Sequence, residues 1–188
     1  MKEQVEILTR SGKETKKLGE ILAQEVLKFA FAKASADKLK TATVLSLEGE
    51  LGSGKTTFTQ GFAKGLGIKE NPRSPTFVIM QIYGVNKLNR SAEFVKFKNF
   101  IHVDAYRLKS KDFKILNWRD FMRNPQNIIL IEWGNRVKII MPRGALILRF
   151  RHGHLPHERT LRISNSEIFN FQSIFKNLKI RNSLEIRN

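Results

Sequence analysis

The chain has 188 residues, 41% of them apolar, with 14 Phe, a composition that excludes an intrinsically disordered protein and predicts one packed domain over 1–188. It contains no Cys, which excludes disulfides, thiolate metal sites and a cysteine nucleophile. Lys and Arg number 34 against 17 Asp and Glu, a net charge of +17. That balance favours contact with polyanions such as nucleic acid, or it reflects a Lys-rich proteome, and the sequence leaves both explanations open.

The first part of the chain predicts a helix and then a buried strand. A Ser11-x-x-Glu14 capping box opens the segment "SGKETKKLGEILAQEVLKFA", in which apolar residues recur at helical spacing from Leu18 to Phe29. The stretch "TATVLSLE" is short, rich in β-branched and aliphatic residues and ended by glycine, as expected of a buried strand. The start "MKEQVEILTR" lacks the apolar core of a secretory signal and no window is apolar enough to span a membrane, so we expect a cytoplasmic protein.

A glycine-rich stretch, "GELGSGKT", follows that strand and matches the pattern G-x-x-x-x-G-K-[ST] from Gly49 to Thr56. Glycines let the backbone N–H groups turn inward around an anion at the start of a helix. Lys55 is then placed to reach the β- and γ-phosphates, and the Thr56 hydroxyl to bind Mg²⁺. An incidental glycine turn is the alternative, but Phe58 and Phe62 continue at helical spacing, so the stretch falls between a strand and a helix as the phosphate-binding function requires.

The second half of the chain predicts further strands and a last helix. "SPTFVIMQIY" is a loop that leads into a strand, "NFIHVD" and "IILIE" are apolar strands that end in acids, and "ALILRFR" and "ERTLRI" are two more strands. Between Gly84 and Asn99 we expect a long polar hairpin connection, and from Ser164 onward a closing helix or tail over 164–188.

The two acids at strand ends complete a candidate site. In a parallel sheet Asp104 and Glu132 would emerge at the same edge as the glycine-rich loop, one to hold the metal and one to act as base or to polarise the attacking water. Thr76 in "SPT" is either a hydroxyl that senses the γ-phosphate or an ordinary turn residue.

The sequence also bears on which nucleotide binds and on the role of the histidines. The only stretch near the guanine-reading N-K-x-D pattern is "NKLN", which lacks its Asp, so ATP is the better candidate. Three of the four histidines crowd into "RHGHLPHE", where we interpret them as surface residues; His102 alternates with apolar neighbours in its strand. We assign neither group a metal-binding or acid-base role.

The motifs "GELGSGKTTFTQGFAKGLGI", "SPTF", "HVDAYRL" and "IEWG" together resemble the bacterial TsaE family of small ATPases that serve threonylcarbamoyladenosine modification of tRNA. The similarity runs from about Leu8 to Ile163. It implies an α/β P-loop NTPase fold, with a mostly parallel central sheet flanked by helices and extended by antiparallel strands. It also implies slow, Mg-dependent hydrolysis of ATP to ADP and phosphate, gated by a TsaB–TsaD-like transferase complex, and direct tRNA contact through the basic surface is a further expectation.

The resemblance also implies roles for single residues. Lys55, Asp104, Glu132 and Thr76 would be catalytic, and Thr56, Glu132 and Asp104 would hold the metal. The residues expected to contact the nucleotide are Thr15, Glu50, Leu51, Gly52, Ser53, Gly54, Lys55, Thr56, Thr57 and Trp133.

Two other functions share part of this pattern. A small-molecule or nucleoside kinase would have the same loop, but it also needs a lid with clustered arginines, which no stretch between Thr76 and Asp104 provides. A non-enzymatic RNA-binding module would explain the charge of +17 but would leave Lys55, Asp104 and Glu132 without a purpose.

Overall fold

The computed structural model describes residues 4–35, 40–75, 78–85, 97–114, 116–164 and 185–187. Its strands are β1 (Gln4–Thr9), β2 (Thr43–Gly49), β3 (Met80–Gly84), β4 (Asn99–Asp104), β5 (Asn127–Glu132), β6 (Leu146–His152), β7 (Arg159–Ser164) and β8 (Glu185–Arg187). Its helices are α1 (Gly12–Ser35), α2 (Lys55–Gly65) and α3 (Trp118–Arg123), with the 3₁₀ helices η2 (Ser110–Lys114) and η3 (Gly134–Ile140).

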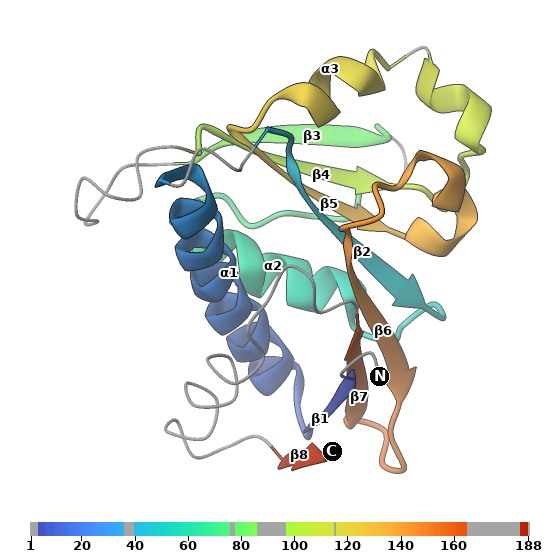
Figure 1. Ribbon diagram of the computed structural model, residues 1–188. Helices are drawn as coiled ribbons and strands as arrows, with labels where there is room; N and C mark the ends of the chain where they lie inside the picture. The colour runs from blue at the N-terminus through green and yellow to red at the C-terminus, as the bar shows by residue number, and fades with distance from the viewer. Residues whose placement is uncertain are drawn as a thin grey trace.

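All eight strands form one sheet in the order β3-β4-β5-β2-β6-β7-β1-β8 (Figure 1). The four central strands, β4, β5, β2 and β6, are parallel to one another, whereas β3 at one edge and β7, β1 and β8 at the other pair antiparallel. This mixed sheet confirms the predicted fold class. The parallel centre also puts the ends of β2, β4 and β5 at one edge of the sheet.

The sheet separates two apolar cores because alternate residues of a strand point to opposite faces. In β5, Ile128 and Leu130 pack into the core under α1 and α2, whereas Ile129 and Ile131 pack into the core that η2, α3 and η3 cover. The strand is buried on both faces, which explains its continuous apolar sequence. The result is three layers, with helices on both sides of the sheet (Figure 1).

Local signals in the sequence explain the two long helices. The Ser11 hydroxyl accepts the Glu14 N–H at 3.1 Å, and Glu14 accepts the Arg10 N–H at 2.7 Å, so the predicted capping box begins α1. After α2, Gly67 has a φ of 81°, the left-handed conformation predicted for it, and donates to the Lys64 carbonyl.

Several elements of the structure were not predicted, and some predicted segments lie outside the described residues. The structure contains five elements that were not predicted from the sequence: β1, η2, α3, η3 and β8. Ser164, where the closing helix was expected to begin, is instead the last residue of β7, and Glu185–Arg187 at the end of the predicted tail form β8. The rest of that predicted helix and most of the connection between Gly84 and Asn99 lie outside the described residues. In the part of the chain that is described, no helix is both long and apolar enough to cross a membrane.

Candidate nucleotide-binding site

The glycine-rich loop connects the end of β2 to the start of α2 and follows a path that only glycine takes without strain. Gly49, Gly52 and Gly54 have φ values of 144°, 73° and 98°. A side chain on Gly49 would also overlap the Phe150 carbonyl oxygen of the neighbouring strand β6. Because Gly54 offers no side chain to cap α2, the N-terminus of that helix remains open to an anion.

Lys55, the first residue of α2, folds its ammonium group back onto the loop. Its Nζ donates to the carbonyl oxygens of Gly49 at 2.9 Å and Glu50 at 2.7 Å, and it lies 3.9 Å from the centre of the Trp133 ring. Burial lowers the pKa of Lys55 below its usual value, while the nearby Glu132 and Asp104 carboxylates act in the opposite direction. The site therefore holds an imperfectly compensated positive charge at the position where a phosphate would bind.

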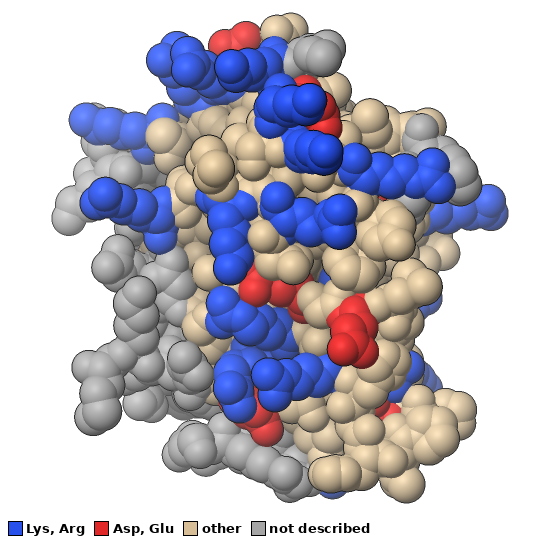
Figure 2. Space-filling model, turned by 90° about the vertical axis from the view of Figure 1, so that its right-hand side faces the viewer, with Lys and Arg blue, Asp and Glu red and all other residues tan. Residues whose placement is uncertain are grey.

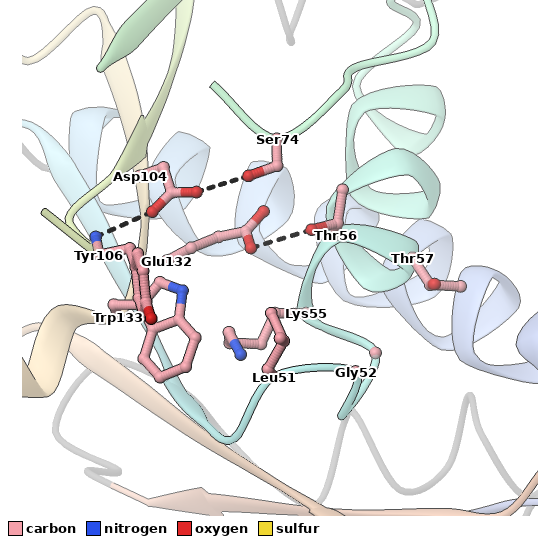
Figure 3. A pocket seen from close by; sticks show the side chains of 11 residues that line it. Leu51, Gly52, Lys55, Thr56, Thr57, Ser74, Asp104, Tyr106, Glu132 and Trp133 are labelled. Carbon is pink, nitrogen blue, oxygen red and sulfur yellow. Dashed lines mark hydrogen bonds between the residues drawn. The ribbon is translucent and has the colours of Figure 1, made fainter. Parts of the chain in front are cut away.

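Glu132, at the end of β5, is buried and bonded to side chains from two elements. Its Oε2 accepts the Thr56 hydroxyl at 3.0 Å (Figure 3). Its Oε1 lies 3.4 Å from the Thr59 hydroxyl, which also donates to the Lys55 carbonyl at 3.0 Å. Both threonines belong to α2, so this carboxylate links β5 to the helix that carries Lys55.

His102 is a further partner of Glu132, although its sequence context gave no reason to assign it a role in the site. Its ring is fully buried, and its Nε2 lies 2.9 Å from Glu132 Oε1, while its Nδ1 has no hydrogen-bond partner among the described residues. With Nδ1 unpaired, we assign the ring proton to Nε2, which then donates to the carboxylate. The only signal in the sequence was a polar residue among the apolar residues of β4, two positions before Asp104.

Asp104 lies beside Glu132 because β4 and β5 are parallel and these two residues are register partners. Its Oδ2 accepts the Ser74 hydroxyl and its Oδ1 accepts the Tyr106 N–H at 2.9 Å (Figure 3). Asp104 is only 4% exposed, so these bonds fix a nearly buried carboxylate. Ser74 and Tyr106 are two further residues that sequence reasoning did not single out.

Two aromatic side chains form one wall of the site. Trp133 adopts a left-handed backbone conformation, with φ 61° and ψ 32°, which is uncommon for a bulky residue. The centre of the Trp133 ring lies 5.0 Å from the centre of the Tyr106 ring. The Arg136 guanidinium lies over the Tyr106 ring, 5.6 Å from its centre. The unusual backbone directs the indole ring toward Lys55 (Figure 3).

These groups surround a cavity of about 380 Å³, a volume within the usual range for small-ligand sites. Its lining brings together Leu51, Gly52, Gly54, Lys55, Thr56, Thr57, Ser74, Asp104, Tyr106, Glu132 and Trp133. Thr15 lies instead in a separate hollow of about 110 Å³, with Thr57 and Arg159.

Two other predicted residues, Ser53 and Glu50, line neither of these hollows. Ser53 is buried, with its Oγ 3.5 Å from Lys55 Nζ, and Glu50 is exposed and contributes its backbone carbonyl. Thr76 lies outside the described residues.

The oxygen atoms of the site fit a hard cation such as Mg²⁺. The Thr56 hydroxyl and the Glu132 carboxylate meet at 3.0 Å, and both are oxygen donors of the kind that this metal prefers. Among the described residues, no three His, Cys, Asp or Glu side chains are grouped to hold a metal ion. A cation here would therefore need oxygens from phosphate and water as well.

The sheet order, the loop and the buried Lys55 define the class of this protein, a nucleotide-binding α/β protein with the P-loop fold. The family model for the threonylcarbamoyl adenosine biosynthesis protein TsaE matches residues 9–161, and the chain belongs to that family.

Similar proteins agree with this membership. The tRNA threonylcarbamoyladenosine biosynthesis protein TsaE of Bacillus subtilis is 38% identical over 119 residues, which span 62% of this chain and 66% of that protein. The protein of the same name from Haemophilus influenzae is 31% identical over 70% of this chain and 80% of its own length. The crystal structure of Bacillus subtilis YdiB superposes with a TM-score of 0.64 at 27% identity, covering 97% of this chain and 99% of that one.

Proposed function

We propose that this protein binds and hydrolyses ATP as an accessory to the threonylcarbamoyladenosine modification of tRNA. Membership of the TsaE family supports the role in tRNA modification. The observation that carries the ATPase assignment is the bond between Thr56 and Glu132 beside Lys55, which is bound to the glycine-rich loop. Two oxygen groups suited to Mg²⁺ therefore lie next to a loop suited to phosphate.

In this proposal Lys55 exchanges the Gly49 and Glu50 carbonyl oxygens for the β- and γ-phosphate oxygens of ATP. The exchange is favourable because carbonyl dipoles compensate an ammonium charge less well than phosphate does. Thr56 and Glu132 would hold Mg²⁺, which when bound neutralises charge on the phosphates. His102, on β4, keeps the other carboxylate oxygen of Glu132 in place.

Asp104 is the second acid of the proposed mechanism. It lines the same cavity as Lys55 and Thr56, where its carboxylate would orient or deprotonate the attacking water or bind the metal through water. Ser74 and the Tyr106 N–H hold both of its oxygens. We propose that Thr76, two residues beyond Ser74, senses the γ-phosphate.

The partner in this proposal is a transferase complex of the TsaB–TsaD type in the cytoplasm. The protein would not touch the transferred group; hydrolysis of ATP would reset the complex. Slow turnover by the isolated chain and faster turnover with the partners are the expected kinetic behaviour.

The test is ATP turnover by the wild-type chain and by Lys55→Ala and Glu132→Ala, each with and without the partner complex and Mg²⁺. Lys69→Ala and Glu70→Ala are matched controls, because these side chains are exposed and lie outside the cavity. We expect both site variants to lose turnover by about a hundredfold or more and the controls to match the wild type.

Three results would contradict the proposal. The first is a wild-type chain that neither binds nor hydrolyses ATP with the partners present, and the second is equal turnover in the site and control variants. The third is transfer of the γ-phosphate to a small acceptor by the isolated chain, which would assign the protein to the kinases.

A further inference from the structure

The surface on which η2, α3 and η3 lie is strongly basic. Every one of the nine Lys and Arg residues between Ala105 and Arg143 is exposed, whereas the acids in the same span are the buried Glu132 and two surface residues, Asp112 and Asp120. Six of the nine define what we call the basic face. They lie just before η2, within η2, in α3 and in η3: Lys109, Lys111, Lys114, Arg119, Arg136 and Lys138. Figure 2 looks onto the side of the molecule where η2 and η3 lie, and Lys and Arg predominate over its upper half.

The six side chains form one surface. η2 contacts both α3 and η3, so the three short helices are neighbours. Between them lies a hollow of about 700 Å³ with Lys114 and Arg119 in its lining, next to Ile139, which is 90% exposed. A concave surface with cations on its rim can follow a convex polyanion.

These charges are not neutralised within the described part of the chain, where none of the six forms an ion pair with an acid. Asp112 accepts the backbone N–H of Lys109 at 2.8 Å, which caps η2 but leaves the Lys109 ammonium group exposed. Like charges that share one surface repel one another, so an anionic partner is favoured there.

On the opposite side of the sheet, several lysines are paired with acids. Around α1 and α2 the lysines alternate with acids, and Lys17 and Lys64 both pair with Glu20, at 3.1 and 3.7 Å, while Lys28 pairs with Glu25 at 2.8 Å. A uniform Lys-rich composition would make both sides alike. Between Ala105 and Arg143, by contrast, nine Lys and Arg residues stand against three acids, and the six that define the basic face form none of these ion pairs with described acids, a difference that a uniform composition does not explain.

The basic face also borders the nucleotide site. Arg136 lies 5.6 Å from the ring of Tyr106, and that ring and Trp133 line the cavity that holds Lys55. A polyanion on this face therefore reaches the rim of the nucleotide cavity.

We propose that the basic face binds the phosphate backbone of a folded RNA. The identity of the RNA as tRNA rests on the proposed function, whereas the face itself rests on the charge distribution. An RNA fits better than an acidic protein segment because the six cations are spread over three elements with only two surface acids among them, as a regular array of phosphates requires.

The test measures binding of tRNA to the isolated full-length chain by fluorescence anisotropy over a range of salt. One variant combines Lys109→Gln, Lys111→Gln and Lys114→Gln on the basic face. The control combines Lys13→Gln, Lys16→Gln and Lys69→Gln, which removes the same charge from exposed positions around α1 and α2. Neither set includes a residue of the nucleotide cavity.

For the wild type we expect log K to fall with log salt at a slope of roughly −4 to −5, as five or six phosphate contacts imply. The face variant should lose more than about tenfold in affinity at about 0.1 M salt, with a slope shallower by about 2 to 3, and the control should stay within about twofold.

The inference is overturned if the wild type does not bind tRNA even at low salt, or if the face and control variants weaken binding equally. It is also overturned if the face variant binds tRNA normally but is no longer stimulated by the partner complex, because the face would then contact protein. ATP turnover measured in the same preparations separates these results from failure of the proposed function, which would remove turnover in all three proteins.

Discussion

At the scale of single residues, the site depends on how Glu132 is held. Its carboxylate is 2% exposed, so the bonds from Thr56 and His102 offset part of the cost of burying a charge. Thr56 must turn toward a metal when one binds, whereas His102 approaches from β4 on the other side. The bond from His102 to Glu132 can therefore persist when a metal binds, which makes His102 a positioning residue.

We predict that His102→Leu lowers ATP turnover by roughly 10- to 100-fold, the usual effect of losing a group that orients a metal ligand. His102→Gln should recover part of the loss, because its amide N–H can still reach the Glu132 carboxylate. The measurement is kcat and the apparent Mg²⁺ affinity, with the unfolding midpoint recorded for each variant. If turnover falls in both variants in proportion to the drop in their unfolding midpoints, His102 is a purely structural residue.

At the scale of elements, the position of α2 fixes the site, and a close crossing with α1 fixes α2. A side chain on Gly61 would overlap the Lys16 carbonyl group of α1, and one on Gly65 would overlap the Glu20 carbonyl oxygen. The glycines thus let the two backbones approach, and the same helix carries Lys55, Thr56 and Thr59. Packing remote from the cavity therefore controls where those three side chains lie.

We predict that Gly61→Ala lowers the free energy of unfolding by about 1–3 kcal/mol or more, because the helices must separate to admit the methyl group. Gly84→Ala is the matched control, since nothing lies within 4 Å of the added carbon, and it should change stability by less than about 0.5 kcal/mol. Urea unfolding measures both. Equal effects in the two variants would mean that the crossing adapts and does not constrain α2.

The elements around the loop could be predicted because each one has a strong local signal. The capping box of α1, the continuous apolar runs of β2 and β5 and the glycines before α2 all specify structure within a few residues. The short helices η2, α3 and η3 have no such signal: they form over Ile129 and Ile131, on a face of the sheet that exists only after folding.

The same distinction separates the residues of the site. Lys55, Asp104 and Glu132 could be predicted because each follows directly from a motif or a strand end. His102 and Ser74 could not, because their roles come from the pairing of β4 with β5 and from the course of the loop before β3.

At the scale of the whole molecule, function and stability make opposite demands on Lys55. The sheet and α2 bury its charge at 5% exposure before any phosphate is present, and burial is the main cause of its lowered pKa. The unfolded chain, with the usual pKa of 10.5, binds the proton more tightly than the native state does. Between the lowered native pKa and 10.5 the stability of the wild type therefore rises with pH, and below that window the full cost of the buried charge is present.

We predict from this that Lys55→Met is more stable than the wild type at neutral pH without nucleotide, and that the difference shrinks as the pH rises toward 10.5. Nucleotide reverses the order. ATP with Mg²⁺ at about 100 times its dissociation constant should stabilise the wild type by about 2.7 kcal/mol, which raises its unfolding midpoint by roughly 5–11 °C, and should leave Lys55→Met unchanged. Thermal unfolding of both proteins over a pH series, with and without ATP and Mg²⁺, measures each effect. Equal stabilisation of the two proteins by ATP would show that Lys55 does not meet the phosphates, and a pH-independent difference between them would show that its buried charge carries no cost.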